Sequence, residues 1–132
     1  MRLVLDTGVL MLVLIGDPGV RRVVELVRSG AEAYTAATNL AELRYKVEEK
    51  LGKAVAVTWA NRLLRTPELQ VVPVDVDLAM KAGELKAKYR TLISLADAIA
   101  LALALDLSAR LITTDEALKS VEEVEVQVIR PK

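Results

Sequence analysis

Four acidic residues stand beside predicted strand ends or helix starts: Asp6, Glu42, Asp97 and Asp115. The chain has no histidine and no cysteine. Imidazole acid–base catalysis, Ser-His-Asp triads, thiolate nucleophiles and zinc sites built on histidine or thiolate are therefore excluded. Any chemistry must run on carboxylates, hydroxyl groups, Lys or Arg side chains, or a bound hard metal ion.

Each of these acids also has a purely structural explanation. Asp6 and Asp115 suit the N-cap position of the helix that follows them, and the pairs Asn39–Glu42 and Ser94–Asp97 have the spacing of capping boxes. Asp97 is the hardest to explain in this way, because the segment around it is otherwise apolar, Ser and Thr. A carboxylate in such a segment is expensive to bury unless it is paired or bound to a metal.

The hydrophobic pattern predicts the elements that position the acids. Strands are expected at 2–5, 33–36, 69–74, 110–114 and 124–129, the last at a sheet edge, and helices at 9–15, 20–27, 40–51 (capped by Thr38 or Asn39), 54–64, 76–88, 95–105 and 116–120. Strands separated by helices predict a parallel sheet with helices on both faces. The carboxyl ends of the strands and the N-termini of the helices then share one edge, where ligands bind at the reversal of strand order.

If the four acids cap helices or end strands, all of them lie at this edge. Carboxylates gathered in a partly dry cleft repel one another, and each helix N-terminus offsets this by only about 0.3–1 kcal/mol. A divalent cation is the natural partner, and oxygen-only ligands favour Mg²⁺ or Mn²⁺ over zinc. Thr7 and Thr113 are placed to hydrogen-bond and orient the acids, although turn chemistry explains Thr7, and strand propensity Thr113, equally well.

Four short motifs surround these acids: LDTGVL around Asp6, TNLAEL around Glu42, SLADAIALALA around Asp97 and LITTDEAL around Asp115. In order and spacing the chain resembles the PIN-domain family, in particular the VapC-type toxins of prokaryotic toxin–antitoxin pairs, over nearly its whole length. The resemblance implies a three-layer α/β/α fold with a five-stranded parallel sheet, acids that hold Mg²⁺ or Mn²⁺, endoribonuclease activity, a homodimer and a cognate antitoxin. Gly8 departs from the family pattern, which more often has a small polar residue there.

The resemblance and the chemistry of phosphodiester hydrolysis together suggest a role for each acid. A metal held by carboxylates lowers the pKa of a bound water and neutralises phosphate oxygens. We expect Asp6 and Asp97 to be the principal metal ligands, and Asp115 and Glu42 to be further direct or water-mediated ligands, with orientation of the attacking water as the other role open to Glu42. The expected function is an Mg²⁺- or Mn²⁺-dependent ribonuclease with catalytic residues Asp6, Glu42, Asp97 and Asp115.

Basic and apolar surfaces suggest the partners. Arg44, Lys46 and Lys50 are candidates for contact with the RNA backbone, although ordinary solvation of a helix face explains them as well. With one Trp, three Tyr and no Phe, base stacking is expected to be minor. An antitoxin is expected to insert an Arg or Lys among the acids, and the strongly apolar segment 9–15 predicts a homodimer.

The composition predicts one domain spanning residues 1–132 with no net charge. No apolar run is long enough to span a membrane, and Asp6 interrupts the N-terminal one, so we expect a cytoplasmic protein without membrane contact. Two alternatives stay open. One is a non-catalytic PIN-like binding module whose acids hold a structural ion. The other is a receiver-type phosphoryl-transfer domain, which usually needs adjacent acids after the first strand and a Lys after the last.

Overall fold

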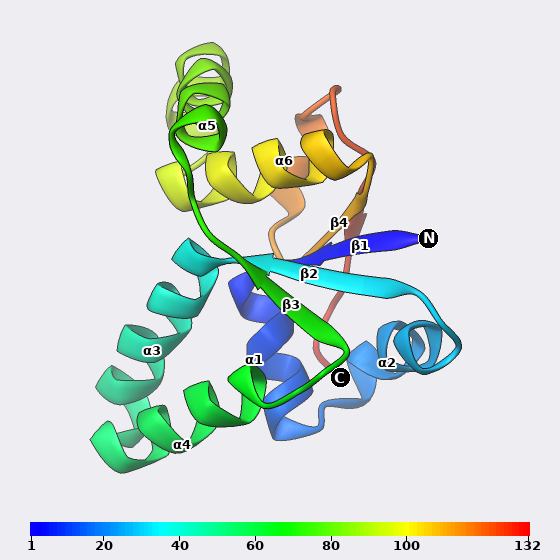
Figure 1. Ribbon diagram of the computed structural model, residues 1–132, viewed down its shortest axis with the longest axis vertical. Helices are drawn as coiled ribbons and strands as arrows, with labels where there is room; N and C mark the ends of the chain where they lie inside the picture. Colours follow the sequence, from blue (N-terminus) through cyan, green and yellow to red (C-terminus); the bar gives the residue numbers. More distant parts are fainter.

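A five-stranded parallel sheet runs through the middle of the molecule in the computed structural model, which describes residues 1–132 (Figure 1). The strands are β1 (Arg2–Leu5), β2 (Glu32–Ala36), β3 (Leu69–Val72), β4 (Arg110–Thr113) and β5 (Val126–Val128). Their order, β3-β2-β1-β4-β5, places β1 at the centre. The chain builds outward from β1 to β3 and then returns to the other side of β1, so strand order reverses between β1 and β4.

Helices cover both faces of the sheet, which confirms the predicted three-layer α/β/α fold (Figure 1). The helices are α1 (Thr7–Ile15), α2 (Arg21–Arg28), α3 (Ala37–Leu51), α4 (Lys53–Leu64), α5 (Val76–Tyr89) and α6 (Leu95–Leu107), with 3-10 turns η1 (Pro18–Val20), η2 (Arg90–Leu92) and η3 (Glu116–Ser120). Helices α1 to α4 lie on one face and α5 and α6 on the other.

The central strand supplies both halves of the core. Leu3 and Leu5 pack among α1 to α4, and Val4 between them points to the opposite face, among α5 and α6. Successive side chains of a strand point to opposite faces, so a central strand must be apolar throughout. The same requirement explains α6, whose residues from Ala98 to Ala104 are all buried between the sheet and α5.

The structure corrects several predicted boundaries. Helix α3 begins at Ala37, after an N-cap at Ala36 that contributes no side-chain hydrogen bond, so the prediction that Thr38 or Asn39 caps this helix is wrong. The short helix at 116–120 is a 3-10 turn. Strands β3 and β5 are shorter than predicted, and the short run at 33–36 belongs to an interior strand between β3 and β1. None of the α-helices combines the length and the apolar composition of a membrane-spanning segment.

Candidate active site at the carboxyl edge of the sheet

Asp6 lies where strand order reverses. It directly follows β1, and its backbone N–H donates to the carbonyl oxygen of Ile112 in β4 at 3.0 Å, which extends the pairing of the two strands to their carboxyl ends. Thr113, the last residue of β4, lies beside it. In open parallel sheets this reversal point is where ligands bind.

Three donors hold the Asp6 carboxylate, which is only 7% exposed. Oδ1 accepts from the backbone N–H of Thr7 at 2.9 Å and from Nδ2 of Asn39 at 3.0 Å, and Oδ2 accepts from the hydroxyl of Thr113 at 2.8 Å. These contacts come from α1, α3 and β4, so three elements fix the position of one carboxyl group. Its hydrogen bond from Thr7 N–H also caps the N-terminus of α1, so the capping explanation of Asp6 is confirmed. Capping does not account for the hydrogen bonds from Asn39 and Thr113.

The charge of Asp6 has no cationic partner. None of the ion pairs in the structure includes Asp6, Asp97 or Asp115. Burial raises the pKa of Asp6 above its ordinary value, and the negative charges of Asp97 and Glu42 raise it further, against the lowering effect of the hydrogen bonds from Thr113 and Thr7. The negative charge of Asp6 is therefore only partly compensated by its hydrogen-bond donors, all of which are neutral.

Glu42 is oriented toward Asp6 through a chain of hydrogen bonds. The hydroxyl of Thr7 donates to Glu42 Oε1 at 2.8 Å, and Asn39 Nδ2 donates to that same hydroxyl oxygen at 3.1 Å. The proposed Asn39–Glu42 capping box does not form, because both side chains turn to the end of β1 instead. The other carboxylate oxygen, Glu42 Oε2, forms an ion pair with Lys46 Nζ at 3.6 Å.

Asn39 is the site residue that sequence reasoning missed. It is fully buried, it joins Asp6 to Thr7, and its Oδ1 has no hydrogen-bond partner. Its place three residues before Glu42 puts both on one face of α3. This i, i+3 spacing is the signal in the sequence, and it is also the spacing of a capping box.

Asp97 both caps a helix and contributes charge to the site. Ser94 is the N-cap of α6, and the predicted capping box is present: Asp97 N–H donates to Ser94 Oγ, and Ser94 N–H donates to Asp97 Oδ2, each at 3.0 Å. The side chain is half-buried, and its charge acts on Asp6. One carboxylate oxygen is thus used by the cap, while Oδ1 makes no hydrogen bond within the protein.

Asp115 lies further out. It is exposed, it caps η3 by accepting from Ala117 N–H at 3.0 Å, and its own N–H donates to Thr113 Oγ1 at 3.1 Å. Thr113 thereby links Asp115 to Asp6 through its hydroxyl. Asp106, at the other end of α6 from Asp97, pairs instead with Lys81 at 2.6 Å.

The acids share an edge without forming a closed cage. No group of three or more acidic side chains lies close enough together to hold a metal ion. The donor set nevertheless suits a hard cation, because Asp6, Glu42, Asp97 and the unpartnered Asn39 Oδ1 are all oxygen donors with no adjacent cation beyond Lys46. Their assignment as ligands stays a prediction.

The basic side chains of α3 are partly neutralised. Arg44 pairs with Glu48 at 2.6 Å and Lys46 with Glu42, both one helical turn apart. Lys50 is exposed and makes no ion pair. These contacts favour the helix-solvation explanation for Arg44 and Lys46.

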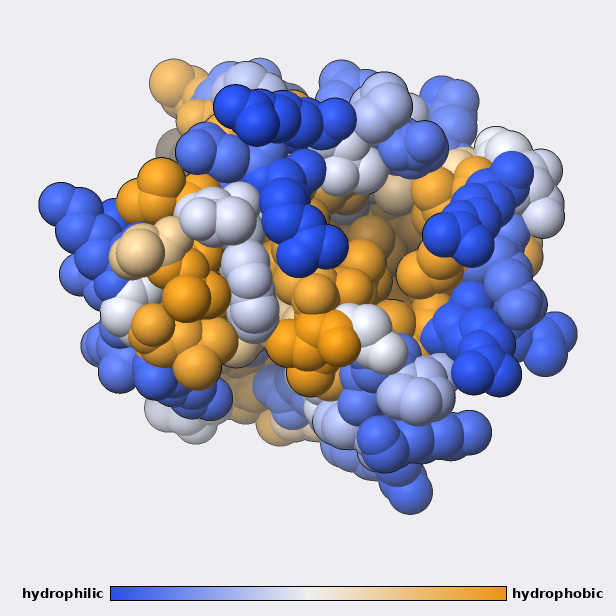
Figure 2. Space-filling model, turned by 90° about the horizontal axis from the view of Figure 1, so that it is seen from below, coloured by the Kyte–Doolittle hydropathy of each residue, from blue (hydrophilic) through white to orange (hydrophobic).

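An apolar groove lies on the α1–α4 face of the sheet. It has a volume of about 450 Å³ and is lined mainly by hydrophobic side chains of α1, α2 and α4, with Arg28, Arg62 and Arg65 among its lining residues. All three arginines are exposed and belong to no ion pair. Figure 2, which views this side of the molecule, shows apolar side chains recessed between hydrophilic ones.

Solved structures share this fold at low sequence identity. A Rickettsia felis VapBC2 complex bound to promoter DNA matches with a TM-score of 0.81 and 18% identity, over 98% of this chain and 100% of that one. The FitAcB structure from Neisseria gonorrhoeae has a TM-score of 0.66 and 25% identity, over 94% and 95%. Mycobacterium tuberculosis VapC20, described as a toxin that cleaves the sarcin-ricin loop, has a TM-score of 0.68 and 21% identity, over 83% and 86%.

Among curated proteins, none matches this sequence. The PIN domain family model matches residues 3–124, which include all four acids of the carboxyl edge. The chain therefore belongs to the PIN domain family.

Proposed function

We propose that this protein is an Mg²⁺- or Mn²⁺-dependent endoribonuclease and the toxin of a VapBC-type toxin–antitoxin pair. The observation that carries the proposal is the Asp6 carboxylate, buried at the reversal point of the sheet with acidic neighbours and no cation. Family membership supports a nuclease, and the likeness to a toxin described as cleaving the sarcin-ricin loop supports RNA as the substrate.

The chain's own residues have distinct parts in this proposal. Asp6 and Asp97 would hold the metal, and Asp115 would be a further ligand, directly or through water. Thr113 and Asn39 fix the Asp6 oxygens, and Thr7 orients Glu42, which would be a further ligand or would orient the attacking water. A bound divalent cation would supply the Lewis acidity, and the positive charge next to the acids, that phosphodiester hydrolysis needs in a chain with no histidine for acid–base catalysis.

Cleavage of mixed RNA by purified protein, with and without Mg²⁺ or Mn²⁺, tests the proposal. We expect metal-dependent cleavage that Asp97→Asn abolishes. Asp106→Asn is the matched control, because it removes the same charge from the opposite end of the same helix. Metal binding without cleavage would favour the non-catalytic module, and cleavage unaffected by Asp97→Asn would contradict the assigned site.

A cognate antitoxin is the proposed protein partner, since the solved structures that share the fold include toxin–antitoxin complexes. The apolar groove suits a segment with apolar side chains, and the unpaired Arg28, Arg62 and Arg65 suit acidic residues flanking them. We propose that the C-terminal segment of the antitoxin occupies this groove and carries an Arg or Lys into the acids of the carboxyl edge.

Mg²⁺ and such a segment would compete for the same carboxylates. The affinity of the antitoxin should therefore fall as the Mg²⁺ concentration rises. Titrations at several Mg²⁺ concentrations measure this dependence, with Arg62→Glu as a variant that weakens binding at the groove alone. An affinity indifferent to Mg²⁺ would place the inhibitor outside the metal site.

A homodimer stays a proposal, but the structure moves its proposed contact surface from α1 to α5. Val9, Leu10, Leu12 and Leu14 of α1 are buried in the core, so this helix no longer supplies the apolar surface that motivated it. Val76 and Met80, one turn apart on α5, are 80% and 66% exposed. Light scattering of the wild type and of Met80→Lys tests α5 as the contact.

A further inference from the structure

A basic hollow lies beside the acidic edge, outside the site described above. It has a volume of about 660 Å³ and is walled by η1 and the start of α2, by η3, and by β5 with the C-terminal segment. Five cationic side chains line it: Arg21, Arg22, Lys119, Arg130 and Lys132. The acidic side chains among its lining residues are Glu25 and Glu116, so the hollow is positive in a chain of zero net charge.

Most of this positive charge is free. Glu116 pairs with Arg130, whereas Arg21, Arg22, Lys119 and Lys132 take part in no ion pair and are exposed. The basic residues of α3 differ, because Arg44 and Lys46 are paired with acids of their own helix. Unpaired cations around one concave surface are the feature that binds a phosphate backbone.

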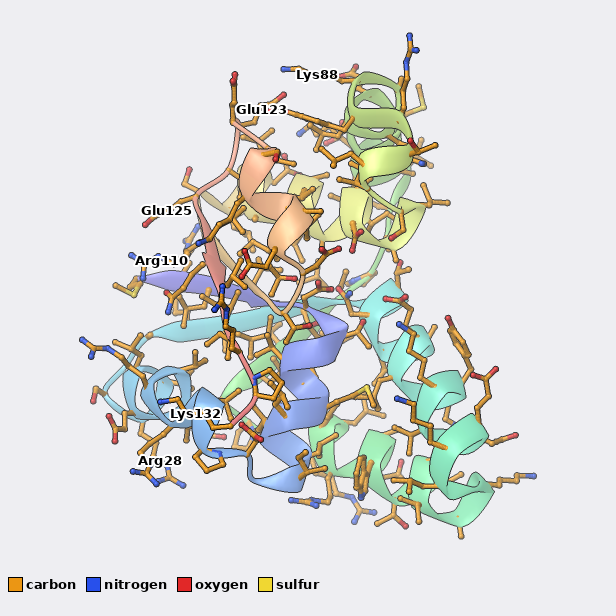
Figure 3. The ribbon with its side chains drawn as sticks, turned by 180° about the vertical axis from the view of Figure 1, so that it is seen from behind. Arg28, Lys88, Arg110, Glu123, Glu125 and Lys132 are labelled. Atoms are coloured by element: carbon orange, nitrogen blue, oxygen red, sulfur yellow. The ribbon has the colours of Figure 1, made fainter.

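The walls of the hollow are held together by specific contacts. Gly19 in η1 lies so close to the C-terminal segment that a Cβ there would stand 2.4 Å from the carbonyl oxygen of Arg130. The backbone N–H of Lys132 donates to Asp17 Oδ2 at 3.0 Å. Figures 1 and 3 agree in placing the C-terminal residue, labelled Lys132 in Figure 3, beside α1 and α2. Close packing and a hydrogen bond therefore hold the C-terminal segment, with Arg130 and Lys132, against η1.

The hollow adjoins the candidate active site directly. Ile129, one of its lining residues, donates its backbone N–H to the carbonyl oxygen of Thr113 at 2.8 Å, and the hydroxyl of Thr113 binds Asp6. Glu116 and Lys119 of η3 follow Asp115 in the chain. Both η3 and the segment after β5 therefore connect the surroundings of Asp6 to the hollow.

We infer that this hollow is the path of the RNA backbone leading away from the cleavage site, with Arg21, Arg22 and Lys119 contacting successive phosphates. The inference rests on the proposed nuclease function for its ligand, but its test requires no cleavage. It places the main RNA contact at the start of α2 and at η3, on the other side of Asp6 from the α3 side chains Arg44 and Lys50.

Fluorescence anisotropy measures the binding directly. The probe is a labelled single-stranded RNA of mixed sequence, longer than the ~4–16 nucleotides that one small domain covers, in EDTA so that no metal-dependent cleavage occurs. Each lost phosphate contact lowers the slope of log affinity against log salt by about 0.7 for a single strand. Arg21→Gln/Arg22→Gln should therefore lower the slope by about 1.4. Between 1 M and 0.1 M salt, the affinity of the variant should thus rise roughly 25-fold less than that of the wild type.

Two matched double variants give the comparison. Lys88→Gln/Arg90→Gln removes the same charge at the far end of α5, where Figure 3 shows Lys88 near Glu123, and should leave affinity and slope unchanged. Arg44→Gln/Lys50→Gln tests the competing surface on α3. Full affinity in the Arg21/Arg22 variant, or an equal loss in all three variants, overturns the inference.

The outcome is separable from that of the proposed nuclease. If the wild type cleaves RNA with metal and the Arg21/Arg22 variant binds RNA normally, the hollow is wrong and the nuclease stands. If the wild type cleaves no RNA yet the Arg21/Arg22 variant alone loses binding, the hollow stands as an RNA surface and the nuclease proposal fails.

Discussion

Replacing Asp97 by Asn separates the structural role of this carboxyl group from its proposed role as a metal ligand. Its Oδ2 accepts from the backbone N–H of Ser94 at 3.0 Å, and the side-chain oxygen of Asn keeps that hydrogen bond. The substitution therefore removes a charge and leaves the cap in place. Losing the attraction to the N-terminus of α6 costs about 0.3–1 kcal/mol, and relief of repulsion with the buried Asp6 offsets part of it.

The expected shift in melting temperature follows from the size of the chain. For 132 residues, an unfolding entropy of about 2.1 cal/mol/K per residue makes 1 kcal/mol equivalent to roughly 3.6 °C. The metal-free variant should thus melt within about 4 °C of the wild type. At free Mn²⁺ one hundredfold above its Kd, the wild type gains about 2.7 kcal/mol, or roughly 10 °C, and Asp97→Asn should lose most of this gain.

Thermal unfolding followed by far-ultraviolet circular dichroism measures both effects, first in EDTA and then with Mn²⁺. Asp106→Asn should keep the full response to Mn²⁺, since Asp106 pairs with Lys81 away from the site. A metal-free loss of more than about 7 °C for Asp97→Asn, or about 2 kcal/mol, would mean that the carboxylate supports the core or the cap. An undiminished response to Mn²⁺ would refute its role as a ligand.

Three further predictions concern the surroundings of Asp6. Burial raises the pKa of Asp6, so at this carboxyl group the metal-free native state binds a proton more readily than the unfolded chain. The stability that this proton contributes is present below the ordinary pKa of 3.8 and is lost as pH rises through the raised pKa. The melting temperature in EDTA should therefore rise on acidification from neutral pH toward this range, and Asp6→Asn should flatten that rise. A Cβ on Gly8 would stand 2.3 Å from Thr114 Oγ1. Gly8→Ala should therefore destabilise the protein by about 1–3 kcal/mol through overpacking, and the higher helix propensity of Ala should offset up to about 1 kcal/mol of this loss. In urea denaturation, Gly8→Ala/Thr114→Ala should recover the lost stability. Asn39→Ala removes the donor shared by Asp6 and Thr7 and should lower Mn²⁺ affinity about 10–100-fold, whereas unchanged calorimetric affinity would show that Asn39 does not position the ligand.

Local patterns were sufficient for most elements of the fold. Apolar runs and helical spacing located every strand and α-helix. The signal is clearest for β1 and α6, where Leu3–Leu5 and Ala98–Ala104 are all buried and all apolar. The capping box Ser94–Asp97 was also predictable, since it depends on residues three apart in the chain. Element ends were less well predicted where the determining contact comes from elsewhere in the fold.

Asn39 shows why the details of the site could not be read from the sequence. Its neighbourhood has the residues of a helix start, yet Asp6, 33 positions earlier, recruits its amide. The helix begins at Ala37 without a side-chain cap, so the capping preference of Asn39 is overridden by a buried hydrogen bond to a carboxylate. Such a contact depends on the sheet order that brings β1 beside β2, which no local pattern contains.

Helix capping and the proposed metal binding are compatible uses of the same carboxylates. In a parallel sheet the helix N-termini point at the edge where the strands end, so a side chain that caps a helix already faces the cleft. Asp6 and Asp97 each make a capping hydrogen bond with one oxygen, and the charge of Asp97 still raises the pKa of Asp6. Their caps offset only part of the cost of gathering negative charge there. The remaining imbalance is what a divalent cation, or the cationic side chain of an inhibitor, would relieve.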